Sequence, residues 1–298
     1  MRLCIFSLTV FLFLGSFTAC SLSQAKLPKH DVSCRGALEL EQSRDNYLQG
    51  RLSAVMDKLD LKVLVEEKKI GVAVVDVTRP SCPRFAGVNE NRMMYAASLP
   101  KIAILFGLFK RIEEGELKWD KRYRALASNM IRYSSNNAAT ELFYAVGPSY
   151  INSLLSSSRY HFYDVNNGGG LWVGKEYGSA PAWKREPLKN LAHAASAMSV
   201  ARFYYMLDTN QLLEQRLTAK MKAVLSKPGL KHKFVKAIMQ RHPHAKMFRK
   251  SGTWIDFHSD SALIERGGRR YIAVVLMENC DGAELLERII IEIDKIIT

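Results

Sequence analysis

Two residues with reactive side chains lie three positions apart at the expected start of an apolar helix. They are Ser98 and Lys101, in the segment "YAASLPKIAILFGLFKRIEEG", residues 95 to 115. Residues three apart on a helix share a face and can touch. A serine hydroxyl is a poor nucleophile until a base takes its proton, and a lysine whose pKa is lowered by burial can be that base. The pair therefore predicts an activated nucleophile at a helix N-terminus, where the helix dipole favours a developing negative charge.

Two further motifs follow in contexts that fit the same chemistry. Residues 134 to 136 read Ser-Ser-Asn within "NMIRYSSNNAATELF", which we expect to form a loop between helices. Residues 250 to 253 read Lys-Ser-Gly-Thr at the end of an expected strand. Ser-x-x-Lys alone is a weak signal, because an N-capping serine followed by an incidental lysine gives the same letters. The three motifs in this order form a much more specific signature.

With these motifs the sequence resembles the penicillin-recognising serine hydrolases, which comprise class A β-lactamases and DD-peptidases (penicillin-binding proteins). The resemblance covers roughly residues 36 to 298, and "MIRYSSNNAATELF" is similar to the family's helix around its second motif. It implies an enzyme that forms an acyl-enzyme by attack on a β-lactam amide, as class A β-lactamases do. The alternative is a D-alanyl-D-alanine carboxypeptidase-like enzyme that acts on peptidoglycan stem peptides and deacylates slowly.

The resemblance assigns catalytic roles to the positions that match the motifs. Ser98 is expected to attack the carbonyl, and Lys101 to take part in removing its proton. Ser134 is expected to relay a proton to the leaving nitrogen. Asn136 is expected to direct its amide at the substrate amide and at Lys101. The backbone N–H groups of Ser98 and Thr253 are expected to form the oxyanion hole.

The third motif is implied to bind the substrate. Lys250 is expected to hold the substrate carboxylate and to tune Ser134. Ser251 and Thr253 are expected to donate hydrogen bonds to the substrate. Gly252 allows a close approach between strand and ligand, because it has no side chain.

Two departures from the family's pattern concern the second motif and deacylation. The middle residue of the second motif, commonly Asp in class A enzymes, is Ser135 here. Class A β-lactamases carry the deacylating base in a loop motif Glu-Pro-x-Leu-Asn, and "EPLKN", residues 186 to 190, lacks the leucine in its place. Glu186 is the candidate base, Glu176 in "GKEYG" is its rival, and the alternative is a solvent-exposed loop carboxylate. Without such a base the acyl-enzyme is long-lived.

The hydrophobic pattern predicts blocks of helices and strands that can position these motifs. The strands expected near each end of the chain cannot make a stable sheet alone, so we expect both ends to join one sheet. The expected order is a helix over 36–67 broken near Asp60, strand regions at 69–77 and 84–97 with a bend at Gly87, helices from 98 to about 157, an irregular segment at 158–187, helices from about 191 to 240, strands at 244–252, 258–266 and 269–278, and a helix at 282–297.

This order predicts an α+β, β-lactamase/transpeptidase-like fold. We expect a five-stranded antiparallel sheet from both chain ends and an all-helical subdomain, with the active site between them. The expected domain spans residues 36–298, of which 36–97 and 244–298 form the α/β part and 98–243 the helical part.

The first 20 residues are typical of a signal peptide, with a positive start and the apolar run "LCIFSLTVFLFLGSF". The run ends in "FTAC", where Cys20 resembles the lipidated cysteine of bacterial lipoproteins. Cleavage after Ala25 is the rival interpretation, and an uncleaved anchor is the alternative, although the run is short for a membrane span. We therefore expect export to the bacterial cell envelope (periplasm), a lipid anchor at Cys20 and a linker over residues 21–35.

The remaining cysteines are Cys34, Cys82 and Cys280. In an oxidising compartment we expect Cys34 to pair with Cys82, and an odd number leaves at least one free thiol. The cysteine and histidine spacings match no zinc pattern, so we expect no metal ion and no other cofactor.

The chain is basic, with a net charge of +14 from 43 Lys and Arg against 29 Asp and Glu. The basic stretch 216 to 250 spaces its charges at helical intervals among apolar residues, which indicates a solvated helix face rather than a nucleic-acid site. We expect a monomer whose partners are its substrate and, through the anchor, a membrane. A non-catalytic envelope-binding lipoprotein is the remaining alternative, and the intact Ser98, Lys101, Ser134 and Lys250 argue against it.

Overall fold

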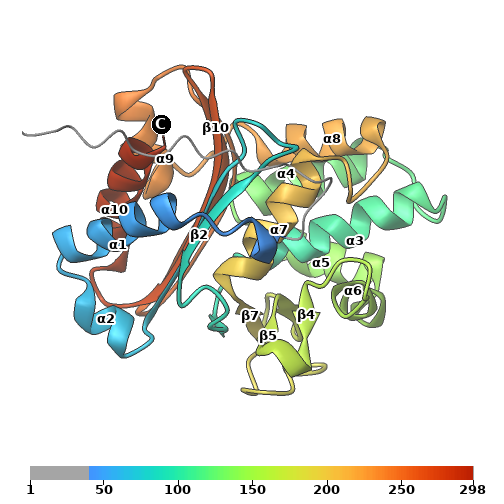
Figure 1. Ribbon diagram of the computed structural model, residues 1–298. Coiled ribbons are helices and arrows are strands. Elements are labelled where there is room, and N and C mark those ends of the chain that lie inside the picture. Colours follow the sequence, from blue (N-terminus) through green and yellow to red (C-terminus); the bar gives the residue numbers. More distant parts are fainter. Residues whose placement is uncertain (1–39, 298) are drawn as a thin grey trace, which may run out of the picture. The chain divides into compact units, whose positions relative to one another are not determined.

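The computed structural model describes residues 40 to 297. Its central element is a five-stranded antiparallel sheet in the order β2-β1-β10-β9-β8 (Figure 1). Strands from the two ends of the chain lie side by side in this sheet, since Val74 of β1 pairs with Ala273 of β10. The predicted α+β fold is therefore confirmed. The strands are β1 (Ile70–Asp76), β2 (Arg84–Val88), β8 (Lys246–Trp254), β9 (Phe257–Arg266) and β10 (Arg269–Glu278).

The sequence of β1 explains why it lies inside the sheet and under cover on both faces. All seven residues of "IGVAVVD" are buried. Successive side chains of a strand point to opposite faces, so Val72 and Val74 enter one apolar core while Ala73 and Val75 enter the other. A strand that packs on both faces has a continuous run of apolar residues. In β1 this run extends from Ile70 to Val75.

One face of the sheet is covered by helices from the two ends of the chain (Figure 1). The closing helix packs through Leu286, Ile289 and Ile293, which recur at helical spacing. The predicted break near Asp60 is confirmed, because this residue has a φ of 56° between two helices. The helices are α1 (Asn46–Lys58), α2 (Lys62–Glu66), α9 (Phe234–Arg241) and α10 (Gly282–Ile296), preceded by a short 3₁₀ helix at Leu40–Ser43.

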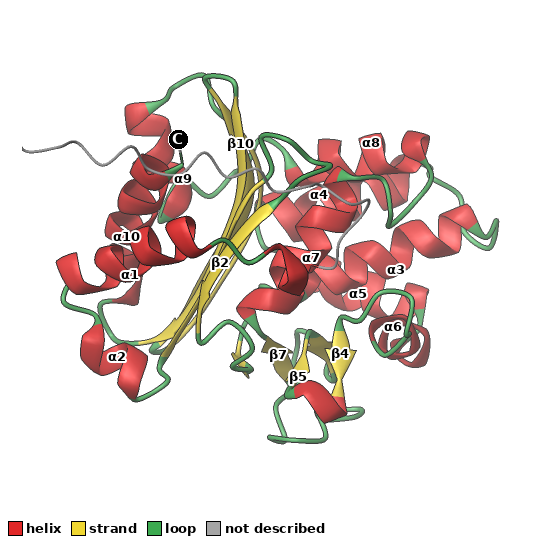
Figure 2. Cartoon of the chain, in the orientation of Figure 1, coloured by secondary structure: helices red, strands yellow, loops and turns green. Residues whose placement is uncertain are grey.

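The other face is covered by α7, with the remaining helices beyond it (Figure 2). The helix that follows Ser98 lies at the centre of this group of helices, and all of its residues from 101 to 110 are buried. A helix that is apolar on all sides needs neighbours on all sides. The helices on this side of the sheet are α3 (Lys101–Glu113), α4 (Lys121–Arg132), α5 (Asn136–Val146), α6 (Pro148–Leu155), α7 (Ala197–Asp208) and α8 (Gln215–Leu225).

The expected irregular segment contains only short elements. The chain there forms two small sheets, one of which also takes in β3. Three consecutive glycines, residues 168 to 170, all have positive φ values and allow the tight path. The elements are β3 (Met94–Tyr95), β4 (Tyr163–Asp164), a 3₁₀ turn (Val165–Asn167), β5 (Gly169–Gly170), β6 (Trp172–Val173) and β7 (His193–Ala195).

Three expected element bounds need correction. Gly87 does not bend the chain but pairs with Ala73 within β2, and the turn comes at Asn89, which has a φ of 46°. The helix expected from residue 191 begins at Ala197, because the residues before it pair as β7 with β3 and β6. Finally, α9 falls within the expected helical part but packs on α10, on the opposite face of the sheet.

Several expectations concern residues outside the described range, namely the signal peptide, Cys20, the linker and Cys34. Within the described range, Cys82 is disulfide-bonded and Cys280 is a free, exposed thiol. None of the helices between residues 40 and 297 has both the length and the apolar content needed to cross a membrane.

Candidate active site

Ser98 lies in a tight turn directly before α3. The N–H of Lys101 donates to the Ser98 carbonyl and the N–H of Ile102 to that of Leu99, both at 3.3 Å, which is the i to i+3 pattern of a 3₁₀ turn. Regular helix therefore begins at Lys101, not at Ser98 as expected. Ala97 has a φ of 49°. The turn leaves Ser98 partly exposed at the N-terminus of a buried helix.

Lys101 is fully buried, and its side-chain nitrogen lies closest to three oxygens, with Ser134 Oγ farther away at 3.5 Å. Nζ lies 3.1 Å from Ser98 Oγ, 2.7 Å from the Ser134 carbonyl and 2.7 Å from Asn136 Oδ1. Among the described residues, no carboxylate forms a hydrogen bond or ion pair with it. Burial lowers the pKa of Lys101 to about 7, so the side chain exchanges its proton near neutral pH.

The second motif occupies the connection between α4 and α5. Ser134 has a φ of 58°, and its hydroxyl accepts a hydrogen bond from Lys250 Nζ at 3.0 Å. Ser135 caps α5, because its Oγ accepts from the N–H of Ala138 at 3.2 Å. Ser, like Asp, is a favoured N-cap, so Ser135 supplies a helix cap at the position where the family commonly has Asp.

The third motif lies on β8, an edge strand of the sheet. Lys250 is almost completely buried. Burial, and next to it the positive charges of Lys101 and Arg249, hold the pKa of Lys250 well below its usual value. Gly252 lies against the turn of Ser98, where a Cβ would come within 2.3 Å of the Ala96 carbonyl oxygen. The absence of a side chain at Gly252 thus allows the strand to pack against the turn of Ser98.

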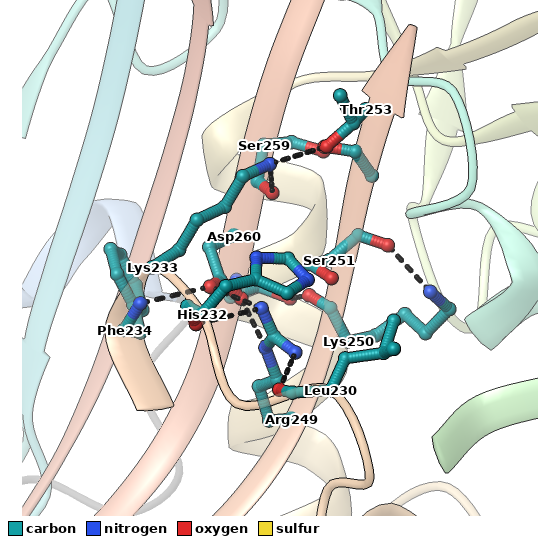
Figure 3. Close-up of polar contacts among 12 residues, drawn as sticks. Leu230, His232, Lys233, Phe234, Arg249, Lys250, Ser251, Thr253, Ser259 and Asp260 are labelled. Atoms are coloured by element: carbon teal, nitrogen blue, oxygen red, sulfur yellow. Dashed lines mark hydrogen bonds and ion pairs between the residues drawn. The ribbon is translucent and has the colours of Figure 1, made fainter. Parts of the chain in front are cut away.

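A buried ion pair fixes the segment behind β8 (Figure 3). Arg249 on β8 and Asp260 on β9 form two hydrogen bonds of 2.7 Å each. Arg249 also donates to the Leu230 carbonyl at 3.1 Å, and Asp260 accepts from the N–H of Phe234 at 3.1 Å. The pair therefore fastens residues 230 to 234 to the sheet.

Lys233 is held in this segment and was not singled out by its sequence. It is buried with a φ of 53°, and Nζ donates to the Gly252 carbonyl at 2.7 Å, to Thr253 Oγ1 at 2.8 Å and to the Ser259 carbonyl at 3.3 Å (Figure 3). Burial lowers its pKa to about 8. An ammonium only donates hydrogen bonds, so the hydroxyl of the exposed Thr253 keeps its own hydrogen for another acceptor.

The carboxylate of Glu186 accepts hydrogen bonds from the backbone of its own loop. Its side chain is buried, which excludes the solvent-exposed alternative. One oxygen accepts from the Tyr163 hydroxyl and from the N–H of Leu188, and the other accepts from the N–H of Lys189. No hydrogen bond joins it to Ser98 or Lys101 in the described structure.

Glu176 is also engaged elsewhere. Its carboxylate accepts from Thr140 Oγ1 at 2.7 Å and from the N–H of Ala180 at 2.8 Å. Burial opposes ionisation, but the hydrogen bonds from Thr140, Ala180 and Gly178 outweigh it and lower the pKa of Glu176. Both candidate carboxylates therefore accept hydrogen bonds from groups other than Ser98 and Lys101.

The aromatic side chain of Tyr177 lies beside Lys101. Its ring centre is 4.4 Å from Lys101 Nζ, and the ring stacks on His193 at 4.2 Å. Its N–H donates to Thr140 Oγ1 at 3.0 Å and its hydroxyl to the Ala97 carbonyl at 3.3 Å. Burial raises the pKa of Tyr177 well above its usual value, so the phenol is neutral. Nothing in the sequence distinguishes this residue within its irregular loop.

The site thus unites residues from three motifs on an α+β fold of β-lactamase type. Among residues 40 to 297, no group of His, Cys, Asp or Glu side chains is arranged to hold a metal ion. The sequence profile of the beta-lactamase enzyme family matches residues 55–125 and 122–298. The chain therefore belongs to this family of penicillin-recognising serine hydrolases. No protein with a curated description matches the sequence.

Solved structures show the same fold at low sequence identity. A beta-lactamase from Sphaerobacter thermophilus DSM 20745 superimposes with a TM-score of 0.63 at 15% identity, over 84% of this chain and 95% of that one. One from Chitinophaga pinensis DSM 2588 gives 0.62 at 14%, over 82% and 97%. A PBP-A mutant, solved as an acyl-enzyme complex with penicillin G, gives 0.64 at 14%, over 85% and 96%.

Proposed function

We propose that the protein is an exported serine hydrolase that is acylated at Ser98 by penicillins and by D-alanyl-D-alanine-like peptide ends, and that it deacylates slowly. The hydrogen-bond geometry around Lys101 supports the acylation. The observation that carries slow deacylation is the position of Tyr177 beside Lys101, which no carboxylate of residues 40 to 297 contacts. This favours the peptidase-like alternative over a fast class A β-lactamase.

The contacts of Lys101 suit the neutral amine as a base. A neutral amine has two N–H donors and one lone pair. The carbonyl of Ser134 and the Oδ1 of Asn136 can only accept, each at 2.7 Å from Nζ. They use both donors, so the lone pair is left for the hydroxyl hydrogen of Ser98 at 3.1 Å. A pKa of about 7 keeps a large fraction of the lysine in this form at neutral pH.

Acylation then proceeds in balanced steps. Lys101 takes the proton of Ser98 Oγ, which bonds to the carbonyl carbon of the substrate amide while the oxyanion is held by the N–H groups of Ser98 and Thr253. The C–N bond breaks as Ser134 gives its proton to the leaving nitrogen. Lys101 Nζ lies 3.5 Å from Ser134 Oγ, and can return the proton it took from Ser98.

The third motif supplies substrate binding in this proposal. Lys250 donates a hydrogen bond to Ser134, and a substrate carboxylate beside it would favour its charged form. Thr253 keeps its hydroxyl hydrogen for the substrate, because Lys233 only donates to it. Both suit a substrate that carries a carboxylate beside the scissile amide. Deacylation needs a base that activates water, and a neutral buried phenol such as Tyr177 is not one.

The test is the intact mass of the purified protein, followed in time after a penicillin is added. We expect a mass gain of one penicilloyl group that persists after free penicillin is removed, and no gain in Ser98→Ala. Consumption of penicillin without an accumulating adduct would instead indicate a β-lactamase. An adduct that forms equally on Ser98→Ala would overturn the assigned nucleophile.

Export and lipidation rest on the sequence pattern of the first 20 residues. The mass of the mature N-terminal peptide tests both. A diacylglyceryl group on Cys20 supports the lipid anchor, whereas a peptide that begins at Lys26 supports simple cleavage, and an intact Met1 contradicts export by either route.

A further inference from the structure

A second recess lies between α9 and the beginning of β8, upstream of the motif that carries Lys250. Its volume is about 800 Å³, within the range of small-molecule pockets. None of the residues of the candidate active site lines it. We call it the α9–β8 groove, and it is formed by Ser226, Lys227, Pro228, Lys231, Val235, Lys236, Met239, Gln240, Ala245, Lys246, Met247 and Phe248.

The floor of the α9–β8 groove is apolar. Val235 and Met247 belong to the core on the α10 side of the sheet and are almost completely buried, and Phe248 is half-buried. Met239 lies on α9 with 37% of its surface exposed. Transfer of an alkyl chain from water to such a surface is favourable, and methionine side chains adapt to ligands of irregular shape.

The rim of the groove is positively charged. Lys236 is neutralised by Glu287, at 2.8 Å. In the part of the chain that the structure describes, Lys227, Lys231 and Lys246 form no ion pair with a carboxylate. No Asp or Glu lines the groove. The apolar floor is thus bordered by three uncompensated ammonium groups.

We propose that the α9–β8 groove binds a single-chain anionic amphiphile, namely a long-chain fatty acid. Its alkyl chain lies on Val235, Met239 and Met247, and its carboxylate lies among the unpaired rim lysines. Charge complementarity selects the anionic head, because a cation would be repelled by the same lysines. The apolar floor selects the chain, since a simple anion would leave it exposed. This site is independent of the function proposed for Ser98.

The first experiment measures binding of alkyl carboxylates of increasing length by calorimetry, below their micelle concentrations. We expect each added methylene to tighten binding by about fourfold until the groove is full, and added salt to weaken it. An alkyltrimethylammonium of equal chain length is expected not to bind. Equal binding of the two head groups, or affinity that does not change with chain length, would refute the proposal.

Two substitutions locate the site. Met239→Glu places a carboxylate on the floor, and Lys231→Glu reverses one rim charge; each is expected to weaken dodecanoate binding by at least about tenfold. Val63→Glu and Lys62→Glu are matched controls on α2, where both positions are exposed, and they should bind as the unchanged protein does. The far-UV circular dichroism spectrum and the urea unfolding midpoint of every variant report that the fold is intact.

Three further outcomes would contradict a fatty-acid site in the α9–β8 groove. If both groove variants bind dodecanoate normally, the fatty-acid site is elsewhere and the proposal is wrong. If the protein binds anionic vesicles but no free fatty acid, the basic face is a membrane surface and not a ligand groove. If sedimentation shows a dimer that Met239→Glu abolishes and fatty acid does not dissociate, a second copy occupies the groove instead.

Discussion

The centre of the Tyr177 ring lies 4.4 Å from the side-chain nitrogen of Lys101, while the candidate glutamates Glu176 and Glu186 accept hydrogen bonds from other groups. The lysine therefore has a hydroxyl, a carbonyl and an amide as polar neighbours and a neutral ring beside them. In the function we propose, this arrangement removes a proton from Ser98, and among the described residues no carboxylate contacts Lys101 where it could activate water. The lifetime of the acyl-enzyme should accordingly depend on residue 177.

Tyr177→Glu should shorten the lifetime of the penicilloyl adduct. A carboxylate beside Lys101 can activate water, and a well-placed general base accelerates such a step by about 10²–10⁴-fold. The measurement is the decay of adduct mass after free penicillin is removed. Tyr177→Phe is the control, because it keeps the ring and loses only the hydrogen bond to Ala97. An adduct equally stable in a folded Tyr177→Glu protein would contradict this account of deacylation.

The rate of acylation should rise with pH and level off above about 7. Lys101 can accept the proton of Ser98 only as the neutral amine, and burial places its pKa at about 7. Well below that pH the rate should fall about tenfold per pH unit, because the neutral fraction falls by that factor. The second-order acylation rate between mildly acidic and mildly alkaline pH tests this. Lys101→Arg, which stays charged, should be inactive at every pH; a flat profile would remove Lys101 as the base.

Lys233→Met should weaken both stability and acylation. The substitution leaves the carbonyl of Gly252 and the hydroxyl of Thr253 without their buried donor, which costs about 1–3 kcal/mol for a buried group. Urea unfolding gives the change in free energy, and the concentration dependence of acylation reports substrate binding. Lys236→Met, on an exposed position of α9, is the matched control. If the two variants behave alike, Lys233 does not orient Thr253.

Asp260→Asn should destabilise the protein by about 3–5 kcal/mol, because it leaves the buried guanidinium of Arg249 without a counter-charge. The free energy of unfolding in urea measures the loss, and Asp57→Asn on the exposed side of α1 should change it little. Hydrogen exchange should also show earlier opening of residues 230 to 234, which the ion pair fastens to the sheet. Unchanged protection there would mean that other contacts hold the segment.

The sequence was sufficient to predict those features that depend on neighbouring residues. The apolar runs of β1 and β10 are local patterns, and each predicted its strand. Ser98 and Lys101 are likewise close in the chain, and their motif predicted the 3.1 Å contact that the structure shows.

Features that depend on tertiary contacts were not predictable in the same way. Tyr177 reaches Lys101 only because an irregular loop folds back onto α5 through Thr140. Lys233 stands in a basic stretch that reads as a solvated helix face, yet the ion pair of Arg249 and Asp260 draws its segment into the interior. The sequence could not show that the carboxylate of Glu186 accepts hydrogen bonds from the N–H groups of its own loop.

The pairing of β1 with β10 also determines when the chain can fold. A nascent chain that has not yet reached β8 holds β1 and β2 only as a two-stranded ribbon, which is marginal in water. Its continuous apolar run must wait for partners from the far end of the sequence, and such distant pairing slows folding. The unfinished chain therefore carries the apolar strand β1 without its partner until β10 has been synthesised.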